Sequence, residues 1–191
     1  MSGMRFDVIV LGAGAAGLLC AAQAGQRGLR VLLIDHAAKV AEKIRISGGG
    51  RCNFTNLGTS PANFLGENPR FCRSALAGYT PAQFVALMQK HQIPFHEKHK
   101  GQLFCDRSAE DLIGLLLAEC DAAPAHGGRV ERWQPCRVRG VRFQAESGSG
   151  AQQASASSYI VDSDQGAVSA PALVIATGGL SIPKIGATDL G

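Results

Sequence analysis

A short apolar run near the start of the chain leads directly into three closely spaced glycines. Phe6 to Leu11 (F-D-V-I-V-L) is rich in β-branched residues, which is typical of a strand buried on both faces. Gly12, Gly14 and Gly17 follow at the spacing G-x-G-x-x-G. In a strand-to-helix turn, the first glycine permits the tight turn, the second lets a pyrophosphate approach, and the third lets the helix pack on the strand. The pattern therefore predicts a βαβ unit that binds a dinucleotide.

An acidic residue ends the second apolar run of this unit. Val31 to Ile34 is followed by Asp35, whose carboxylate can accept hydrogen bonds from a ribose 2'-hydroxyl and would repel a 2'-phosphate. The bound nucleotide is thus expected to be the AMP half of FAD or NAD rather than NADP. We expect its phosphates to lie at the N–H groups of the helix that begins near Ala15 and Ala16.

The same N-terminal stretch has some features of a targeting segment. Residues 8–26 carry no charge, and Ala22-Gln23-Ala24 resembles the small-residue pattern of a signal-peptidase site. However, Asp7 lies at the front of the apolar run, and glycine is too frequent for a membrane-spanning helix. We therefore expect a cytoplasmic protein with no membrane partner.

Composition favours one globular domain over residues 1–191. The chain has 46% hydrophobic and 18% charged residues and a net charge of +4. Its basic residues are scattered, except in 90–100 (K-H-Q-I-P-F-H-E-K-H-K), which is typical of a solvated loop. The cysteines form no C-x-x-C pair, so we expect reduced thiols and no metal site; they are Cys20, Cys52, Cys72, Cys105, Cys120 and Cys136.

Hydrophobic periodicity predicts further helices and strands along the chain. Thr80, Pro81 and Gln83 form the capping pattern of a helix over 80–92, and Ser108 is expected to cap a second helix. Strands are expected at 93–96, 102–105, 129–132 and 172–176. From residue 137 onward the period changes to two, which predicts an antiparallel meander interrupted by an exposed loop at 147–158. We expect a polar loop at 39–56.

That loop contains a second group of chemically distinctive residues. Three consecutive glycines, Gly48 to Gly50, lie between the cations Lys43 and Arg45 and the segment Arg51 to Asn56. Free backbone next to cations suits an anion or a flat ring, because glycine permits close approach and unusual dihedral angles. A flexible surface loop is the alternative interpretation.

Taken together, these motifs resemble those of the YhiN/BaiN-like flavoproteins. The resemblance is carried by K-I-R-I-S-G-G-G-R-C-N-F-T-N, by the preceding G-A-G-A-A-G and by the later A-T-G-G-L-S-I-P-K. It implies an α/β fold: a glutathione-reductase-type, Rossmann-like FAD-binding domain with a parallel sheet and an antiparallel β-meander. It also implies that this chain is the N-terminal part of such a protein, without the inserted substrate domain and the C-terminal return segment.

The resemblance further implies an FAD-dependent oxidoreductase in which hydride passes through the flavin, with NAD(P)H as one candidate transient donor. The substrate is an unassigned small molecule, and oxidase, dehydrogenase and reductase activities all remain open. No catalytic residue is assigned, and Cys52 is interpreted as a small polar loop residue. The residues implied to bind the cofactor are Gly12, Gly14, Ala15, Ala16, Gly17, Asp35, Lys43, Gly48, Gly49, Gly50, Arg51, Cys52, Asn53, Val138, Thr177, Gly178 and Gly179.

Two alternative functions remain open at this point. A noncatalytic or RNA-directed nucleotide-binding module would use the segment 90–100 to meet phosphates, although its only support is that charge cluster. An NAD-dependent dehydrogenase would explain Gly12 to Asp35 equally well. It would leave the Gly48 to Asn53 loop without a role.

Overall fold

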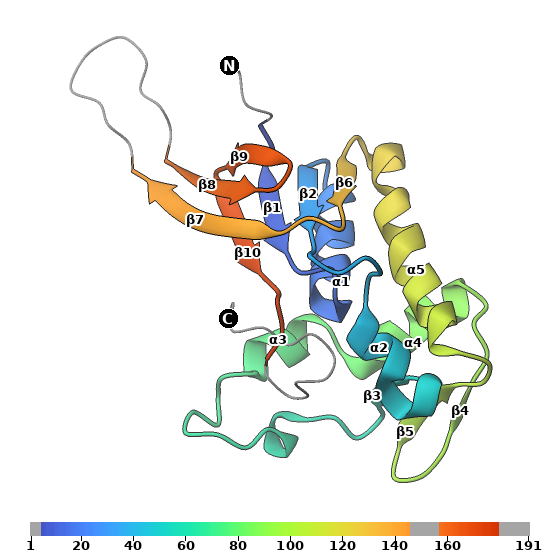
Figure 1. Ribbon diagram of the computed structural model, residues 1–191. Helices are drawn as coiled ribbons and strands as arrows, with labels where there is room; N and C mark the ends of the chain where they lie inside the picture. Colours follow the sequence, from blue (N-terminus) through green and yellow to red (C-terminus); the bar gives the residue numbers. More distant parts are fainter. Residues whose placement is uncertain (1–4, 146–156, 180–191) are drawn as a thin grey trace. The chain divides into compact units, whose positions relative to one another are not determined.

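The computed structural model describes residues 5–145 and 157–179, and these form two compact units (Figure 1). The first unit is Met1–Lys43 with Leu116–Gly191, and the second is Ile44–Leu115. No helix within the described ranges is both long and apolar enough to cross a membrane.

A four-stranded parallel sheet forms the centre of the first unit, in the order β10-β1-β2-β6. Its strands are β1 (Val8–Leu11), β2 (Arg30–Ile34), β6 (Arg129–Trp133) and β10 (Ala172–Ile175). The helix α1 (Ala15–Gly25) connects β1 to β2, as the βαβ pattern predicts. All four residues of β1 are buried, because continuous apolar strands in parallel sheets are covered on both faces.

The predicted antiparallel meander is confirmed as a three-stranded sheet, β7-β8-β9. It consists of β7 (Val138–Gln144), β8 (Ser158–Ser163) and β9 (Gly166–Ala170). Val161 and Val168 of the meander share one hydrophobic cluster with Ile9 and Leu32 of the parallel sheet. Most of the predicted loop 147–158 lies outside the described residues.

The helix α5 (Ala109–Asp121) spans the boundary between the two units, and its last turns pack on α1. Gln26 Nε2 donates a hydrogen bond of 2.9 Å to the buried carboxylate of Glu119. Cys120 Sγ donates to the carbonyl oxygen of Leu18 over 3.4 Å. As predicted, Ser108 caps the helix, because its Oγ accepts from the N–H of Glu110. The short 3₁₀ helix η3 (Ala123–His126) follows.

The second unit contains a small antiparallel sheet in the order β3-β5-β4. It is built from β3 (Asn53–Asn56), β4 (Phe95–Glu97) and β5 (Gln102–Cys105). The helix α4 (Pro81–Lys90) contacts β3. The capping box of α4 is confirmed, since the N–H of Gln83 donates to Thr80 Oγ1 and Gln83 Oε1 accepts from the N–H of Thr80.

The expectation of a loop throughout 39–56 is wrong in part. This segment forms α2 (Glu42–Ile46), the 3₁₀ turn η1 (Ser47–Gly50) and β3. The strand β3 exists because it pairs with β5, some fifty residues away in the chain, and local periodicity does not report such a partner. Three further elements were also not predicted: η2 (Pro61–Asn63), α3 (Arg73–Gly78) and η3.

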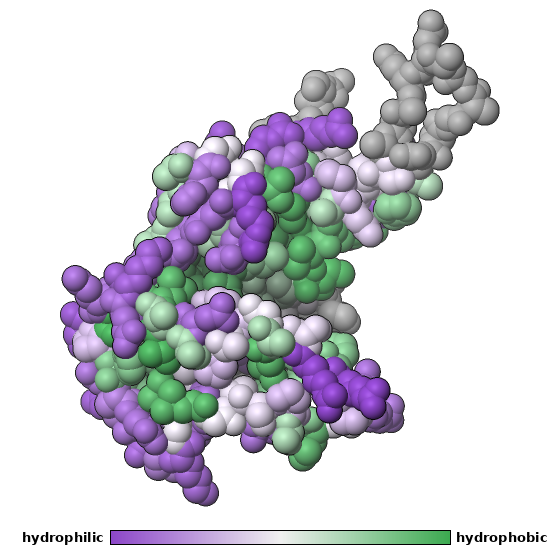
Figure 2. All heavy atoms as spheres, turned by 180° about the vertical axis from the view of Figure 1, so that it is seen from behind, coloured by the Kyte–Doolittle hydropathy of each residue, from purple (hydrophilic) through white to green (hydrophobic). Residues whose placement is uncertain are grey.

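Hydrophobic residues also reach the surface. Figure 2 shows them on one face as patches between polar residues. In the second unit, Phe64, Leu65 and Phe71 are 50%, 95% and 83% exposed. All three lie in the segment between η2 (Pro61–Asn63) and α3 (Arg73–Gly78).

Candidate functional site

The turn after β1 requires glycine at two of the three fingerprint positions. Gly12 has φ +101°, and a Cβ built on it would lie 2.5 Å from the carbonyl oxygen of Ala176. A Cβ on Gly17 would lie 1.8 Å from the carbonyl oxygen of Gly12. Backbone conformation and close packing therefore explain both residues without reference to a ligand.

Gly14 is different, because nothing in the described parts of the chain requires a glycine there. Its φ of −82° is open to any residue, and no atom of the described residues lies within 4 Å of a Cβ built on it. No described residue therefore fills the space in front of Gly14, at the start of α1. A pyrophosphate that approaches the backbone would fill this space, which is the role predicted for the second glycine of the fingerprint.

The start of α1 supplies donors for such an anion. The first amide bonded within the helix is that of Leu18, which donates to the carbonyl oxygen of Gly14 at 2.9 Å. The N–H groups of Ala15, Ala16 and Gly17 therefore have no acceptor within the helix. The first turn contains no acidic residue, so the helix does not itself neutralise the positive end of its dipole. The residues present fit a dinucleotide pyrophosphate.

Asp35 connects the end of β2 to this turn. Its Oδ2 accepts a hydrogen bond from the N–H of Ala13 at 2.5 Å, and its Oδ1 accepts from the N–H of Ala37 at 2.8 Å. The side chain is only 14% exposed. Each carboxylate oxygen still has acceptor capacity for a ribose hydroxyl, because an ionised carboxylate offers about four acceptor sites. Asp35 thus holds the glycine turn in place and remains able to bind a ribose.

The sheet order places the end of β10 beside the glycine turn. β1 pairs with β2 on one side and with β10 on the other. The connections from β1 and to β10 therefore lead to opposite sides of β1, which makes its carboxyl end a topological switch point. In open α/β sheets, ligands bind in the crevice at such a switch point. The N–H of Ala176 donates to the carbonyl oxygen of Leu11, and Thr177 lies next to Gly12. The predicted Thr177, Gly178 and Gly179 therefore begin at the crevice.

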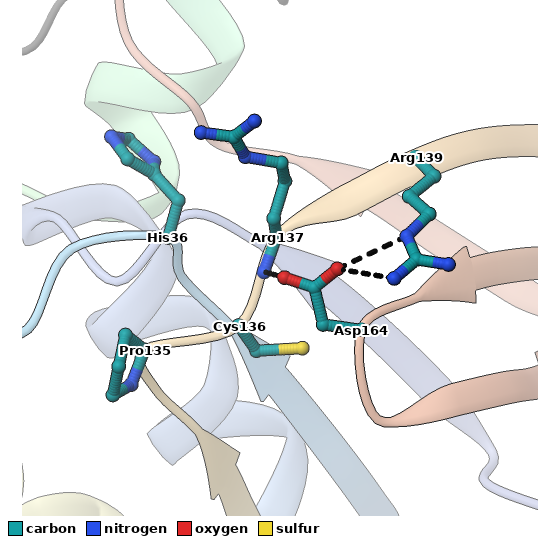
Figure 3. Close-up of a pocket in the computed structure, with 6 residues that line it drawn as sticks. All are labelled: His36, Pro135, Cys136, Arg137, Arg139 and Asp164. Atoms are coloured by element: carbon teal, nitrogen blue, oxygen red, sulfur yellow. Dashed lines mark hydrogen bonds and ion pairs between the residues drawn. The ribbon is translucent and has the colours of Figure 1, made fainter.

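A pocket of about 620 Å³ lies next to the end of β2. Its lining residues are His36, Pro135, Cys136, Arg137, Arg139 and Asp164 (Figure 3). It adjoins Asp35 directly, because the N–H of Cys136 donates to the carbonyl oxygen of Asp35 at 2.8 Å. An adenosine whose ribose met Asp35 would have its base on this side of the sheet.

Two arginines of this pocket have different surroundings. Arg139 Nη2 donates to Asp164 Oδ1 at 2.8 Å, and the N–H of Arg137 donates to Asp164 Oδ2 at 3.2 Å. The Arg139 guanidinium, with the Arg137 amide, holds the pKa of Asp164 below its ordinary value. In Figure 3 the side chains of His36 and Arg137 extend in the same direction, away from this ion pair. The predicted Val138, half-buried against the core, lies between the two arginines in sequence.

The sequence predicted Val138 in this region but not the residues that line the pocket. They come from the turn after β2, the segment after β6 and the turn between β8 and β9. No spacing in the sequence connects these three segments, and only the pairing of β7 with β8 brings Asp164 near Arg137.

The second unit holds the other predicted constellation, Gly48 to Asn53. Gly48, Gly49 and Gly50 have φ values of +58°, +68° and +86°, which only glycine adopts without strain. A Cβ on Gly48 would lie 2.8 Å from Cε1 of Phe104, whereas Gly49 and Gly50 have no described atom within 4 Å of theirs. Arg51 and Asn53 are exposed. The loop thus presents open backbone next to an exposed guanidinium.

Cys52, within this loop, is buried and has a neighbouring thiol that the sequence did not reveal. Burial raises the pKa of the Cys52 thiol. Burial also raises the pKa of the Cys105 thiol to about 12, and the nearby Cys52 thiol adds to this effect. Thiols in such surroundings stay protonated and are poor nucleophiles. In the parts of the chain described, no three metal-ligating side chains gather in one place.

Lys43 is exposed and is the last residue of the N-terminal segment of the first unit. The contribution of every predicted residue to a cofactor site, including Lys43 and the Gly48 to Asn53 loop, stays a prediction. The glycine turn, Asp35, Val138 and the start of 177–179 all belong to the first unit.

Curated proteins similar to this chain have names that describe reductions. The chain is 46% identical over 187 residues to a ribosomal RNA dihydrouridine synthase of Escherichia coli, covering 98% of the chain and 43% of that protein. It is 42% identical to a protein of the same name from Haemophilus influenzae, covering 96% of the chain and 43% of that protein. A 3-dehydro-bile acid delta(4,6)-reductase of Clostridium scindens is 24% identical, with 95% of the chain and 41% of that protein covered. The chain therefore spans less than half the length of these relatives.

Solved structures confirm the fold class. The glycine oxidase of Geobacillus kaustophilus matches with a TM-score of 0.57 and 19% identity, covering 95% of this chain and 57% of that one. The apo Sdh1 complex of Mycobacterium smegmatis matches with a TM-score of 0.58 and 21% identity, covering 92% of this chain and 34% of that one. The family model described as the HI0933-like protein Rossmann domain matches residues 6–191. The chain belongs to the HI0933-like family and contains its Rossmann domain.

Proposed function

We propose that this chain is the FAD-binding part of a flavin-dependent reductase. The observation that carries the proposal is the free space at Gly14, at the start of a helix whose first N–H groups lack partners within the helix. Gly12 and Gly17 have structural reasons to be glycine, whereas no described residue requires a glycine at position 14, so a bound pyrophosphate best accounts for Gly14.

Each part of the cofactor has candidate residues. Gly14 and the N–H groups of Ala15 to Gly17 would bind the pyrophosphate, Asp35 the ribose, and the pocket beside Val138 the adenine. Thr177 to Gly179 would flank the cofactor at the switch point. From the family resemblance, Lys43 and the Gly48 to Asn53 loop would meet the flavin ring. Exposed Lys43 and Arg51 would stabilise negative charge there.

When bound, FAD supplies hydride transfer between a donor and the substrate. The buried Cys52 and Cys105 offer no thiolate for a covalent mechanism, so binding and orientation are the contributions expected of this chain's residues.

We further propose a substrate class from the names of the relatives. Dihydrouridine is uridine with its ring carbon–carbon double bond reduced, and the bile acid reductase is named for double bonds conjugated to a ketone. Both names describe reduction of a double bond conjugated to a carbonyl group. Ribosomal RNA uridine is the first candidate, because the two relatives above 40% identity have that name. NAD(P)H is the proposed donor.

The test uses a protein extended to the length of these relatives, loaded with FAD and supplied with NADPH. Anaerobic addition of NADPH should bleach the flavin band near about 450 nm. Incubation with ribosomal RNA should then yield dihydrouridine, detected by mass spectrometry of the nucleosides. Bleaching without dihydrouridine would contradict the RNA substrate alone, whereas failure to bind FAD would contradict the flavoprotein proposal itself.

A further inference from the structure

We propose that the β4–β5 hairpin is an RNA-binding element, with Lys98 and Lys100 at its turn contacting phosphates of the RNA backbone. The proposal rests on the function proposed above, since the RNA substrate comes from the relatives' names. The proposal identifies the hairpin as the part of this chain that would bind the RNA.

The turn of this hairpin is held by several hydrogen bonds. The N–H of Lys98 donates to the carbonyl oxygen of Gln102 at 3.0 Å, and the N–H of Gly101 donates to Glu97 Oε1 at 2.9 Å. From outside the hairpin, Asn56 Nδ2 donates to the carbonyl oxygen of Lys100 at 2.8 Å. The turn therefore presents its side chains from an ordered backbone, which lowers the entropy cost of binding.

The charges at the turn favour an anionic partner. Lys98, His99 and Lys100 are consecutive and exposed. Glu97 and Asp106 are the acidic residues nearest in the chain, and their carboxylates bond to other groups: Glu97 Oε1 accepts from the Gly101 N–H, and Asp106 Oδ1 lies 2.6 Å from His96 Nδ1. Lysine serves as a compact point charge for phosphates and has little base specificity. The hairpin thus suits the backbone of RNA.

The same hairpin contacts the glycine loop through one aromatic ring. The Lys98 ammonium lies 5.3 Å from the centroid of the Phe104 ring, and the His96 ring stacks on Phe104 at 6.3 Å. A Cβ on Gly48 would lie 2.8 Å from that ring, and the N–H of Cys105 donates to the carbonyl oxygen of Arg51. The turn that carries Lys98 is thus connected to the glycine loop through Phe104 and Arg51, all within the second unit.

A charge-matched pair of double variants tests this surface. Lys98→Gln with Lys100→Gln removes the two turn cations. Arg27→Gln with Arg142→Gln removes two exposed cations of the first unit that bond to Gln23 and Asp162. Both pairs change the net charge equally, so a general charge effect would affect them alike. The probe is a fluorescein-labelled single-stranded oligouridine of about 12 nucleotides, titrated at several salt concentrations.

We expect the lysine variant alone to lose affinity. Two lost phosphate contacts should reduce the slope of log K against log salt by about 1.4, which corresponds to about 25-fold weaker binding at about 0.1 M salt. Retained flavin should be the same in all three proteins. Equal losses in the two variants, or no RNA binding by a flavin-loaded parent chain, would overturn the inference and leave the flavoprotein proposal intact. A parent chain without flavin would instead overturn the function on which it rests.

Discussion

Replacing Gly14 by alanine should separate cofactor binding from folding. The added methyl group has no described atom within 4 Å, and φ is −82°, so alanine fits the apo structure. Restricting the unfolded chain would stabilise the fold by about 0.4–1 kcal/mol, and the weaker N-cap would offset about 0.5 kcal/mol of this. The free energy of unfolding of the apo protein should therefore change by less than about 0.5 kcal/mol.

FAD affinity should fall in the same variant. The methyl group would occupy the space where a pyrophosphate approaches the backbone. One hydrogen bond from a backbone N–H to the charged pyrophosphate would then be lost. Such a bond contributes about 1.5–3 kcal/mol, which corresponds to about 10- to 150-fold weaker binding. Affinity can be followed by quenching of Trp133, the chain's one tryptophan, whose carbonyl oxygen accepts from the Asp35 N–H.

Gly17→Ala is the matched control, because its Cβ would lie 1.8 Å from the carbonyl oxygen of Gly12. It should lose apo stability and FAD binding together. Urea unfolding of the apo proteins and FAD titration distinguish the two patterns. Unchanged FAD affinity in a folded Gly14→Ala variant would refute the assignment of the free space to a pyrophosphate.

Three further predictions concern stability and thiol reactivity. Asp35→Ala should destabilise even the apo protein by about 1–3 kcal/mol in urea unfolding, because it leaves two backbone N–H groups without their acceptor. The Arg30 guanidinium and N–H lower the pKa of Asp7, so their stabilising effect is present above the ordinary value of 3.8 and is lost as pH falls through the folded-state value. Parent stability should therefore decline more steeply than that of Asp7→Asn in acid, and parallel pH profiles of unfolding would contradict this. Burial raises the pKa of Cys105 to about 12 and of Cys120 to about 11, so neither should react with a thiol reagent at neutral pH until the protein unfolds, as mass mapping would show.

Local sequence signals predicted the elements that local chemistry determines. The Thr80 capping box, the strand before Gly12 and the period-two meander all appear in the structure because each depends on neighbouring residues. Their ends differ by a residue or two: the first strand was expected at 6–11 and spans Val8–Leu11. The strand Asn53–Asn56 was missed because its partner, Gln102–Cys105, is distant in sequence.

Some residues of the candidate site could be predicted from local sequence, and others could not. Gly12, Gly14 and Asp35 could be identified from spacing, because one βαβ unit brings them together. Sequence could not show that Asp35 also holds the Ala13 N–H, nor that Asp164 and Arg139 line a pocket beside it. Those relations depend on the register between strands, which local patterns do not encode.

FAD binding by the first unit can be tested by absorption spectroscopy. The purified chain is mixed with excess FAD, desalted, and its visible absorption spectrum recorded beside that of the Gly14→Ala variant. We expect the parent to retain bands near about 370 and 450 nm, at close to one flavin per chain, and the variant to show weaker bands. A colourless parent, even when extended to the length of its relatives, would contradict FAD binding.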